Sequence, residues 1–143
     1  MKIVIINGPN LNMLGIREPG IYGEGTYNEL LEFIREKADE MGVETDFFQS
    51  NSEGAIIDKI QECYGEADGI VINPGAYTHY SYAIHDAIKS VMIKAVEVHI
   101  SDIHQREDFR KVSVTAPACI RQISGLGWDG YIEAIKELKN GKA

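Results

Sequence analysis

The fold class is decided by Lys2-Ile3-Val4-Ile5-Ile6-Asn7-Gly8-Pro9-Asn10, a β-branched run that ends abruptly in a polar turn. The same arrangement recurs at Gly69-Ile70-Val71-Ile72-Asn73-Pro74-Gly75-Ala76 and around Glu97-Val98-His99-Ile100-Ser101. Each apolar run predicts a buried strand, and each polar turn marks the carboxyl end of that strand. Ligands of open α/β sheets bind beyond these ends, where the strand order reverses. We therefore expect an enzyme whose site is built from the three turns.

Strand and helix patterns alternate along the chain. Strands are predicted at 2–7, 43–49, 69–73, 94–99 and 118–124, and helices at 27–41, from the Ser50–Glu53 capping box to about 66, at 81–91 and at 128–138. This alternation predicts a parallel sheet with helices on both faces. At 143 residues, we expect a single domain over 1–143. Its fold class is α/β: a flavodoxin-like three-layer sandwich whose five-stranded parallel sheet has the order 2-1-3-4-5, which brings the three turns into one cleft.

Composition narrows the class of partner. The formal net charge is −8 and the chain has no basic stripe, which argues against nucleic acid and anionic membranes and favours a small soluble molecule. No apolar run is long enough to cross a bilayer, and the first residues resemble a strand rather than a signal peptide, so we expect a cytoplasmic protein. Cys63 and Cys119 are expected to be buried, reduced thiols.

A long loop between Gly8 and Gly25 is predicted to be a lid, at about 15–25. Gly20, Gly23 and Gly25 can supply hinge conformations around Tyr22. The alternative is a loop without function that carries a solvated arginine. The glycines do not have the spacing or the position of a dinucleotide fingerprint, and no histidine pair has metal-ligand spacing, so we expect neither a nicotinamide cofactor nor a metal.

Two charged groups follow the fourth predicted strand. Glu97 and His99 are two residues apart, so their side chains point to the same side, and a carboxylate behind an imidazole makes a competent proton donor. The alternative is a structural ion pair at the end of a strand. Arg106 and Arg110 are four residues apart, so on a short helix they would share a face and suit an anion. In isolation, the same segment could be an ordinary solvated charge run.

Together, four separated motifs resemble type II 3-dehydroquinate dehydratase. They are Asn7 to Leu11 with Gly15, Arg17-Glu18-Pro19 and Tyr22-Gly23; Asn73 to His79; Glu97 to Ser101; and Arg106-Glu107 with Phe109-Arg110. The resemblance spans nearly the whole chain. It implies a hydro-lyase of the shikimate pathway, acting in aromatic amino-acid biosynthesis, although quinate breakdown would use the same step. The reaction removes water from 3-dehydroquinate by an anti elimination through an enolate, without metal or organic cofactor.

The resemblance also implies a role for each site residue. Tyr22 is the base, and Arg17 and Arg106 stabilise its phenolate. Asn10 holds a water against the enolate oxygen, and His99, oriented by Glu97, is the acid. The remaining matched residues bind substrate: Asn73, Ile100 and Ser101 the carboxylate, and His79, Arg110 and Asp86 the ring hydroxyls. Asp86 is expected to reach a neighbouring subunit's site in a homo-oligomer, a dodecamer built of trimers.

Some positions depart from the family pattern. Asp102 stands where Asn is expected and adds negative charge near the carboxylate pocket. Ile120-Arg121-Gln122 replaces small or apolar residues, and we expect this change to affect subunit contacts rather than the chemistry. A carrier or binding module with the same fold, holding a flavin or another anion in the crevice, is the alternative function. Pro9 and the apolar residues from Leu11 to Leu14 count against it, because they do not form a phosphate loop.

Overall fold

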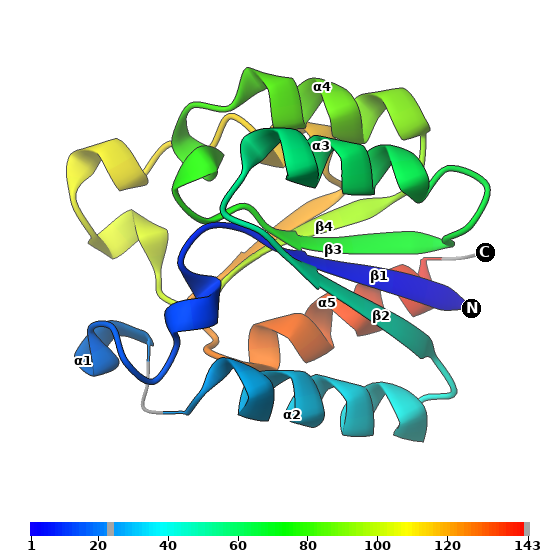
Figure 1. The fold of residues 1–143 in the computed structure, drawn as a ribbon, viewed down its shortest axis with the longest axis horizontal. Helices are drawn as coiled ribbons and strands as arrows, with labels where there is room; N and C mark the ends of the chain where they lie inside the picture. Colours follow the sequence, from blue (N-terminus) through cyan, green and yellow to red (C-terminus); the bar gives the residue numbers. More distant parts are fainter. Residues whose placement is uncertain (23–24, 142–143) are drawn as a thin grey trace.

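Within residues 1–22 and 25–141, which the computed structural model describes, parallel strands form one sheet with the order β2-β1-β3-β4-β5 (Figure 1). The strands are β1 (Lys2–Asn7), β2 (Glu44–Gln49), β3 (Gly69–Asn73), β4 (Ala95–His99) and β5 (Arg121–Ser124). The predicted α/β class and strand order are confirmed. The order reverses between β1 and β3, which are paired in register from Ile3 opposite Gly69 to Asn7 opposite Asn73.

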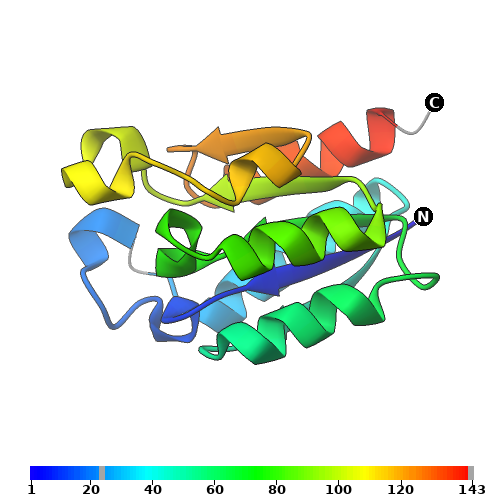
Figure 2. The same cartoon turned by 90° about the horizontal axis from the view of Figure 1, so that it is seen from above.

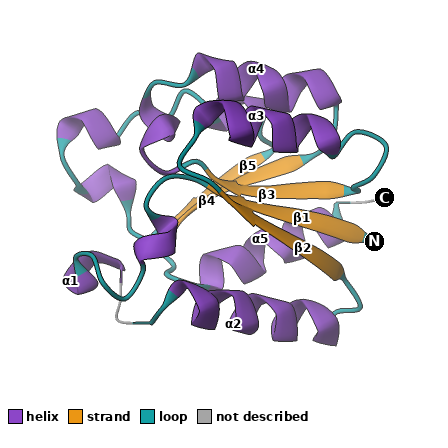
Figure 3. Cartoon of the chain, in the orientation of Figure 1, coloured by secondary structure: helices purple, strands orange, loops and turns teal. Residues whose placement is uncertain are grey.

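Two helical layers enclose the sheet (Figure 3). Helices α2 (Tyr27–Glu40) and α5 (Asp129–Asn140) cover one face, and α3 (Glu53–Glu62) and α4 (Tyr82–Val91) cover the other. In Figure 2, the short helical segments α1 (Pro19–Tyr22), 11–13, 75–79, 103–105 and 108–110 lie at one end of the strands, whereas the turn 116–118 lies beside α4. None of the helices in the described residues has the length and apolar character needed to cross a membrane.

The alternation of side chains in β1 explains the two layers. Ile3 and Ile5 are buried in the core that α2 and α5 close, whereas Val4 and Ile6 are buried in the core that α3 and α4 close. Fully burying one such side chain contributes about 1.5–3 kcal/mol. Because both faces of β1 are covered, every residue from Ile3 to Ile6 is apolar, and polar groups first appear at Asn7 where the sheet ends.

The predicted element boundaries needed three corrections. Ser50 does not start α3, because its N–H still donates to the carbonyl of Asn7 in the extended chain; Ser52 is the N-cap instead. The helix ends at Glu62 rather than near 66, before the left-handed turn at Gly65 (φ 77°). Strand β5 begins at Arg121 rather than 118, because 116–118 form a 3₁₀ turn.

The loop after β1 is partly helical. It contains a 3₁₀ turn, Leu11–Met13, and a four-residue helix, α1 (Pro19–Tyr22). Among the described residues of this loop, Asn10, Gly15 and Glu18 have left-handed backbone, whereas Gly20 and Gly25, two of the glycines predicted to act as hinges, do not. Gly20 lies within α1, Gly25 packs so closely on Trp128 that a Cβ would lie 2.4 Å from the ring, and Gly23 falls outside the described residues.

Candidate active site

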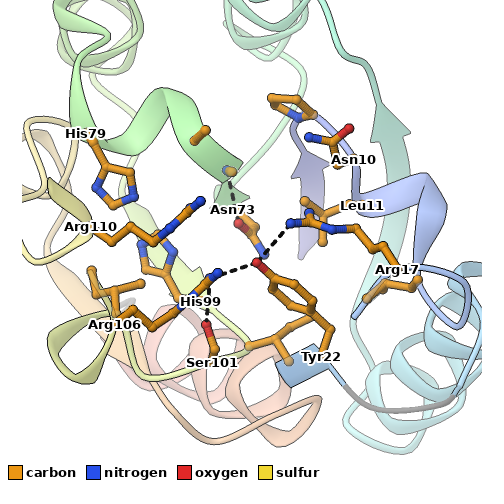
Figure 4. Close-up of a pocket in the computed structure, with 16 residues that line it drawn as sticks. Asn10, Leu11, Arg17, Tyr22, Asn73, His79, His99, Ser101, Arg106 and Arg110 are labelled. Atoms are coloured by element: carbon orange, nitrogen blue, oxygen red, sulfur yellow. Dashed lines mark hydrogen bonds between the residues drawn. The ribbon is translucent and has the colours of Figure 1, made fainter. Parts of the chain in front are cut away.

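The turns after β1, β3 and β4 converge on one cleft at the carboxyl ends of these strands (Figure 4). The fold explains this convergence, since the three strands are neighbours on either side of the point where the strand order reverses. The cleft is lined by Pro9, Asn10, Leu11, Leu14, Arg17, Tyr22, Asn73, Gly75, Ala76, His79, His99, Ile100, Ser101, Ile103, Arg106 and Arg110.

The hydroxyl of Tyr22 is held by two guanidinium groups (Figure 4). Arg106 Nη1 donates to it at 2.7 Å and Arg17 Nη2 donates at 3.1 Å. The guanidinium of Arg17 also lies over the phenol ring, 4.3 Å from its centroid. Tyr22 and Arg17 come from the loop after β1, whereas Arg106 follows β4, so these contacts bridge the cleft. The phenol oxygen of Tyr22 is therefore the shared acceptor of two guanidinium donors from different parts of the chain.

Across the cleft, His99 is held by a buried carboxylate. His99 Nε2 lies 2.9 Å from Glu97 Oε2, and both side chains are at the end of β4 with exposures of 5% and 0%. Glu97 therefore lies behind the imidazole and outside the lining of the cleft. A donor at Nε2 leaves Nδ1 as the ring nitrogen that can exchange a proton with a ligand.

Glu97 has further hydrogen-bond donors that the sequence did not suggest. Ser113 Oγ donates to Oε2 at 2.8 Å, Gln122 Nε2 donates to Oε2 at 2.9 Å, and the hydroxyl of Thr115 donates to Oε1. Burial by itself raises the pKa of Glu97. The hydrogen bond and charge of His99, together with hydrogen bonds from Gln122 and Thr115, outweigh burial, so the pKa of Glu97 is lowered. The carboxylate is therefore kept ionised inside the protein.

A buried hydrogen-bond chain fixes the amide of Asn73. Its Oδ1 accepts from the N–H of Gly75 at 3.1 Å, and its Nδ2 donates to the hydroxyl of Tyr131 at 3.2 Å. Tyr131 in turn donates to Asn7 Oδ1 at 2.6 Å, and burial raises the pKa of its phenol. Tyr131 thus remains a neutral hydroxyl that ties α5 to the ends of β1 and β3. No role for Tyr131 was predicted from the sequence.

The remaining side of the cleft is formed by His79 and by two cationic side chains, Arg106 and Arg110. His79 Nδ1 donates to the carbonyl of Val112 at 2.7 Å, and burial lowers the pKa of the imidazole. Arg106 and Arg110 both reach the cleft, but the prediction that they share one helix is wrong. Arg110 belongs to a separate 3₁₀ turn, 108–110, because extended backbone at Glu107 (ψ 151°) interrupts the segment.

Three further predicted positions have distinct places. Asn10 adopts left-handed backbone (φ 71°), and its N–H donates to Asn51 Oδ1 at 3.0 Å while the residue lines the cleft. Asp86 lies on α4 with its side chain 80% exposed beside His85, and it does not line the cleft of its own chain. Asp102 caps the turn 103–105 by accepting from the N–H of His104 and also lies outside the cleft lining.

This arrangement agrees with the comparisons with known proteins. A family model described as "Dehydroquinase class II" matches residues 1–139. The chain belongs to this family. It is 63% identical over 140 residues to the 3-dehydroquinate dehydratase of Clostridium beijerinckii, covering 97% of this chain and 96% of the relative. It is 64% identical over 139 residues to that of Caldicellulosiruptor saccharolyticus, covering 96% of each.

A solved structure is similar over the same extent. The type II dehydroquinase from Butyrivibrio crossotus superposes with a TM-score of 0.96 at 60% sequence identity, covering 97% of each chain. The family resemblance found from the four motifs is thereby confirmed. In this class II dehydroquinase, no group of three or more His, Cys, Asp or Glu side chains in the described residues is arranged to hold a metal ion.

The positions missed by sequence reasoning in this dehydroquinase are mainly partners of buried polar groups. Gln122 could have been found from the sheet order, because it lies directly opposite Glu97 in the pairing of β4 with β5. Ser113 and Thr115 carried no such signal, since they lie in an irregular segment before β5. Leu11, Leu14 and Ile103 add apolar lining that the polar motifs did not indicate.

Proposed function

We propose that this protein removes water from 3-dehydroquinate to give 3-dehydroshikimate, as a hydro-lyase of the shikimate pathway. The single observation that carries the proposal is the Tyr22 hydroxyl, which accepts hydrogen bonds from Arg17 and Arg106 at the mouth of a cleft. A phenol held between two guanidiniums is suited to accept a proton. Family membership and the names of the relatives, 3-dehydroquinate dehydratase, support the same substrate.

Tyr22 is proposed to act as the general base. A carbon-bound proton next to the ketone passes to the phenolate oxygen, and the electron pair forms an enolate. One cation at about 4 Å stabilises such a charge by about 4 kcal/mol at an effective dielectric of 20. Partial burial of the phenol opposes ionisation. The proposed base therefore uses both guanidinium groups, Arg17 and Arg106, to stabilise the negative charge on the Tyr22 oxygen.

His99 is proposed to act as the general acid. The enolate electrons form the new carbon–carbon double bond while the hydroxyl on the β carbon leaves with the proton of His99 Nδ1, so water is the leaving product. Glu97 behind Nε2 fixes the tautomer and stabilises the charged ring. Tyr22 and His99 line the same cleft from different elements, the loop after β1 and the end of β4, and we propose that they act on opposite faces of the substrate, as an anti elimination requires.

The polar turns are proposed to bind the rest of the substrate. Asn10, with backbone groups near Pro9 and Ala76, holds a water against the enolate oxygen. The amide of Asn73 binds the carboxylate, with the backbone N–H groups of Ile100 and Ser101. Two further residues, His79 and Arg110, are placed to contact the ring hydroxyls.

Asp86 is proposed to complete the site of a neighbouring copy. Its exposed carboxylate on α4 lies outside its own cleft, so it serves a substrate only where another subunit approaches. We therefore propose a homo-oligomer, a dodecamer built of trimers. Light scattering of the purified protein measures the mass, and a monomer that retains full activity would contradict this part.

The function is tested by adding 3-dehydroquinate to purified protein from which metal ions have been removed with a chelator. The expected product contains a double bond conjugated with the ketone, so absorbance of the enone rises with time. Purified folded protein that produces no enone would reject the proposal.

A further inference from the structure

Gln122 connects the buried carboxylate of the site to the protein surface. Its Nε2 donates to Glu97 Oε2 at 2.9 Å, and its Oε1 lies 3.3 Å from His104 Nε2, where the ring N–H can donate. Both contacts follow from the strand pairing, which places Gln122 of β5 directly opposite Glu97 of β4. The side chain does not line the cleft, so it cannot contact substrate itself.

Four hydrogen-bonding groups surround the carboxylate of Glu97, and three of them share one oxygen, Oε2. A carboxylate offers about four lone-pair positions. His99, Ser113 and Gln122 approach Oε2, and Thr115 donates to Oε1. Gln122 Nε2 and His99 Nε2 both contact Glu97 Oε2. The position of the Gln122 amide therefore influences how the Glu97 carboxylate is oriented toward the imidazole of His99.

We propose that Gln122 is a positioning residue for the dehydration: it fixes the carboxylate of Glu97 and thereby the ring of His99. The inference rests on the proposed function. Gln122 supplies a hydrogen bond without adding a charge, so it fixes the carboxylate and leaves the contact between Glu97 and His99 intact. Ser113 and Thr115 hold the same carboxylate from the segment before β5, so Gln122 is its contact on the β5 side.

His104 explains why the amide points in this direction. A glutamine amide can be turned around, which would bring its carbonyl oxygen against the carboxylate of Glu97 and cause repulsion. A donor at His104 Nε2 stabilises the productive orientation, because the Gln122 carbonyl then has its own partner. His104 is exposed and lies outside the cleft lining, so its substitution should not disturb the core.

The titratable groups around Glu97 define a readout in the pH profile. They are His99 in direct contact, His79 across the cleft, Cys119, and His104 through the amide. Burial raises the pKa of the Cys119 thiol to about 12, so this group stays neutral. The hydrogen bond from Gln122 contributes to the lowered pKa of Glu97. Losing it moves the loss of activity on acidification to higher pH.

The main test compares Gln122→Met with Arg121→Met. Methionine keeps the length of glutamine but has no donor, whereas Arg121 is the neighbouring residue of β5 and pairs with Glu137 on the surface. For Gln122→Met we expect kcat to fall by roughly ten- to hundredfold. KM should be unchanged, because Gln122 does not touch substrate, and the acid limb of the kcat profile should move to higher pH. Arg121→Met should behave as wild type.

Gln122→Glu provides a test with a distinctive sign. Above its pKa the introduced carboxyl repels Glu97, so activity near neutral pH should fall further than in Gln122→Met. At lower pH the introduced carboxyl is protonated and donates as the amide did, so the variant should regain activity relative to Gln122→Met. Simple damage to the strand would not produce this reversal.

His104→Ala keeps the proposal testable if the core variants fold poorly. It should lower kcat severalfold and shift the acid limb in the same direction as Gln122→Met. Unchanged kcat and pH profiles in folded Gln122→Met, or equal losses in Arg121→Met, would overturn the inference. If Gln122→Met does not fold, a wild-type profile in His104→Ala would overturn it. Absence of dehydration by the wild type would instead overturn the proposed function, and this inference with it.

Discussion

The two walls of the cleft are built differently. Glu97 and His99 lie in a covered strand, are almost fully buried, and are held by four donors within the core. Tyr22 lies on a four-residue helix in the long loop after β1 and is held by guanidiniums whose side chains reach the surface. One wall of the cleft is thus part of the sheet, at the end of β4, and the other is formed by the loop that follows β1.

The difference separates stability from activity. A change in the wall around Glu97 leaves a buried charge with an unfilled acceptor position, so it affects folding and chemistry together. A change at Tyr22 affects groups that water can solvate, so it should affect chemistry alone. Each of the following substitutions tests this division.

The largest effect is expected for Tyr22→Phe. Removing the phenol oxygen abolishes proton abstraction, and a general base contributes about 10²–10⁴ in rate. We expect kcat to fall within this range while the midpoint of thermal unfolding and the binding of a substrate analogue remain close to wild type. Steady-state assays and calorimetry measure the three quantities. A variant that loses stability as well would break the proposed division between the walls.

Thr115→Val tests the opposite wall. The two side chains have similar shapes, but valine cannot donate to Glu97, so the buried carboxylate loses a partner. We expect the free energy of unfolding to fall by about 1–3 kcal/mol. Urea denaturation measures this loss, with Tyr22→Phe as the control from the other wall. Equal stability of the two variants would contradict the comparison.

Acidification should reduce the contribution of Glu97 to the free energy of unfolding. The pKa of Glu97 is below its ordinary value of 4.5 in the folded protein. Between these two values the unfolded state binds more protons, so the contribution of Glu97 to stability is complete above 4.5 and is lost as pH falls through the folded pKa. The difference in unfolding free energy between wild type and Glu97→Gln should narrow across this window. A constant difference in a pH series of urea denaturations would show that ionisation of Glu97 is not involved.

The smallest effect is expected for Glu107→Gln. The Glu107 carboxylate pairs with Arg110 at the exposed rim, and this contact lowers the pKa of Glu107. Surface pairs contribute little to stability. We expect no resolvable change in thermal unfolding and a change in KM of about twofold or less. A large rise in KM would show that the pair positions Arg110 and that the rim is more ordered than the comparison implies.

The fold was predictable because its signals are local. Continuous apolar runs and helix-capping residues lie within single segments, and β1 contained every feature needed to infer a parallel strand covered on both faces. Ser50 shows the limit of such signals. It has the type and spacing of an N-cap, but its N–H belongs to the sheet, and only the pairing with Asn7 decides this.

The site was predictable where the functional residues follow strands directly. Tyr22 and Arg106 could be associated only through the family resemblance, because they are far apart in sequence and lie on irregular segments. The expectation that Ile120-Arg121-Gln122 affects subunit contacts stays a prediction, and the hydrogen bond from Gln122 to Glu97 was not predicted from the sequence. The predicted sheet order places β5 beside β4, but the pairing of Gln122 with Glu97 also depends on the register of the two strands, which no local pattern encodes.

The hydroxyl of Tyr131 is needed to complete the cleft, but it is synthesised only with the last helix of the chain. It bridges Asn7 and Asn73 at the floor of the cleft, yet it is supplied by the last helix. A nascent chain that has emerged only through β5 contains all strands and all residues lining the cleft, but the amide of Asn73 lacks this partner. Ribosome-bound intermediates should therefore acquire substrate recognition only after α5 has been synthesised, and truncation before residue 131 should cost recognition as well as core packing.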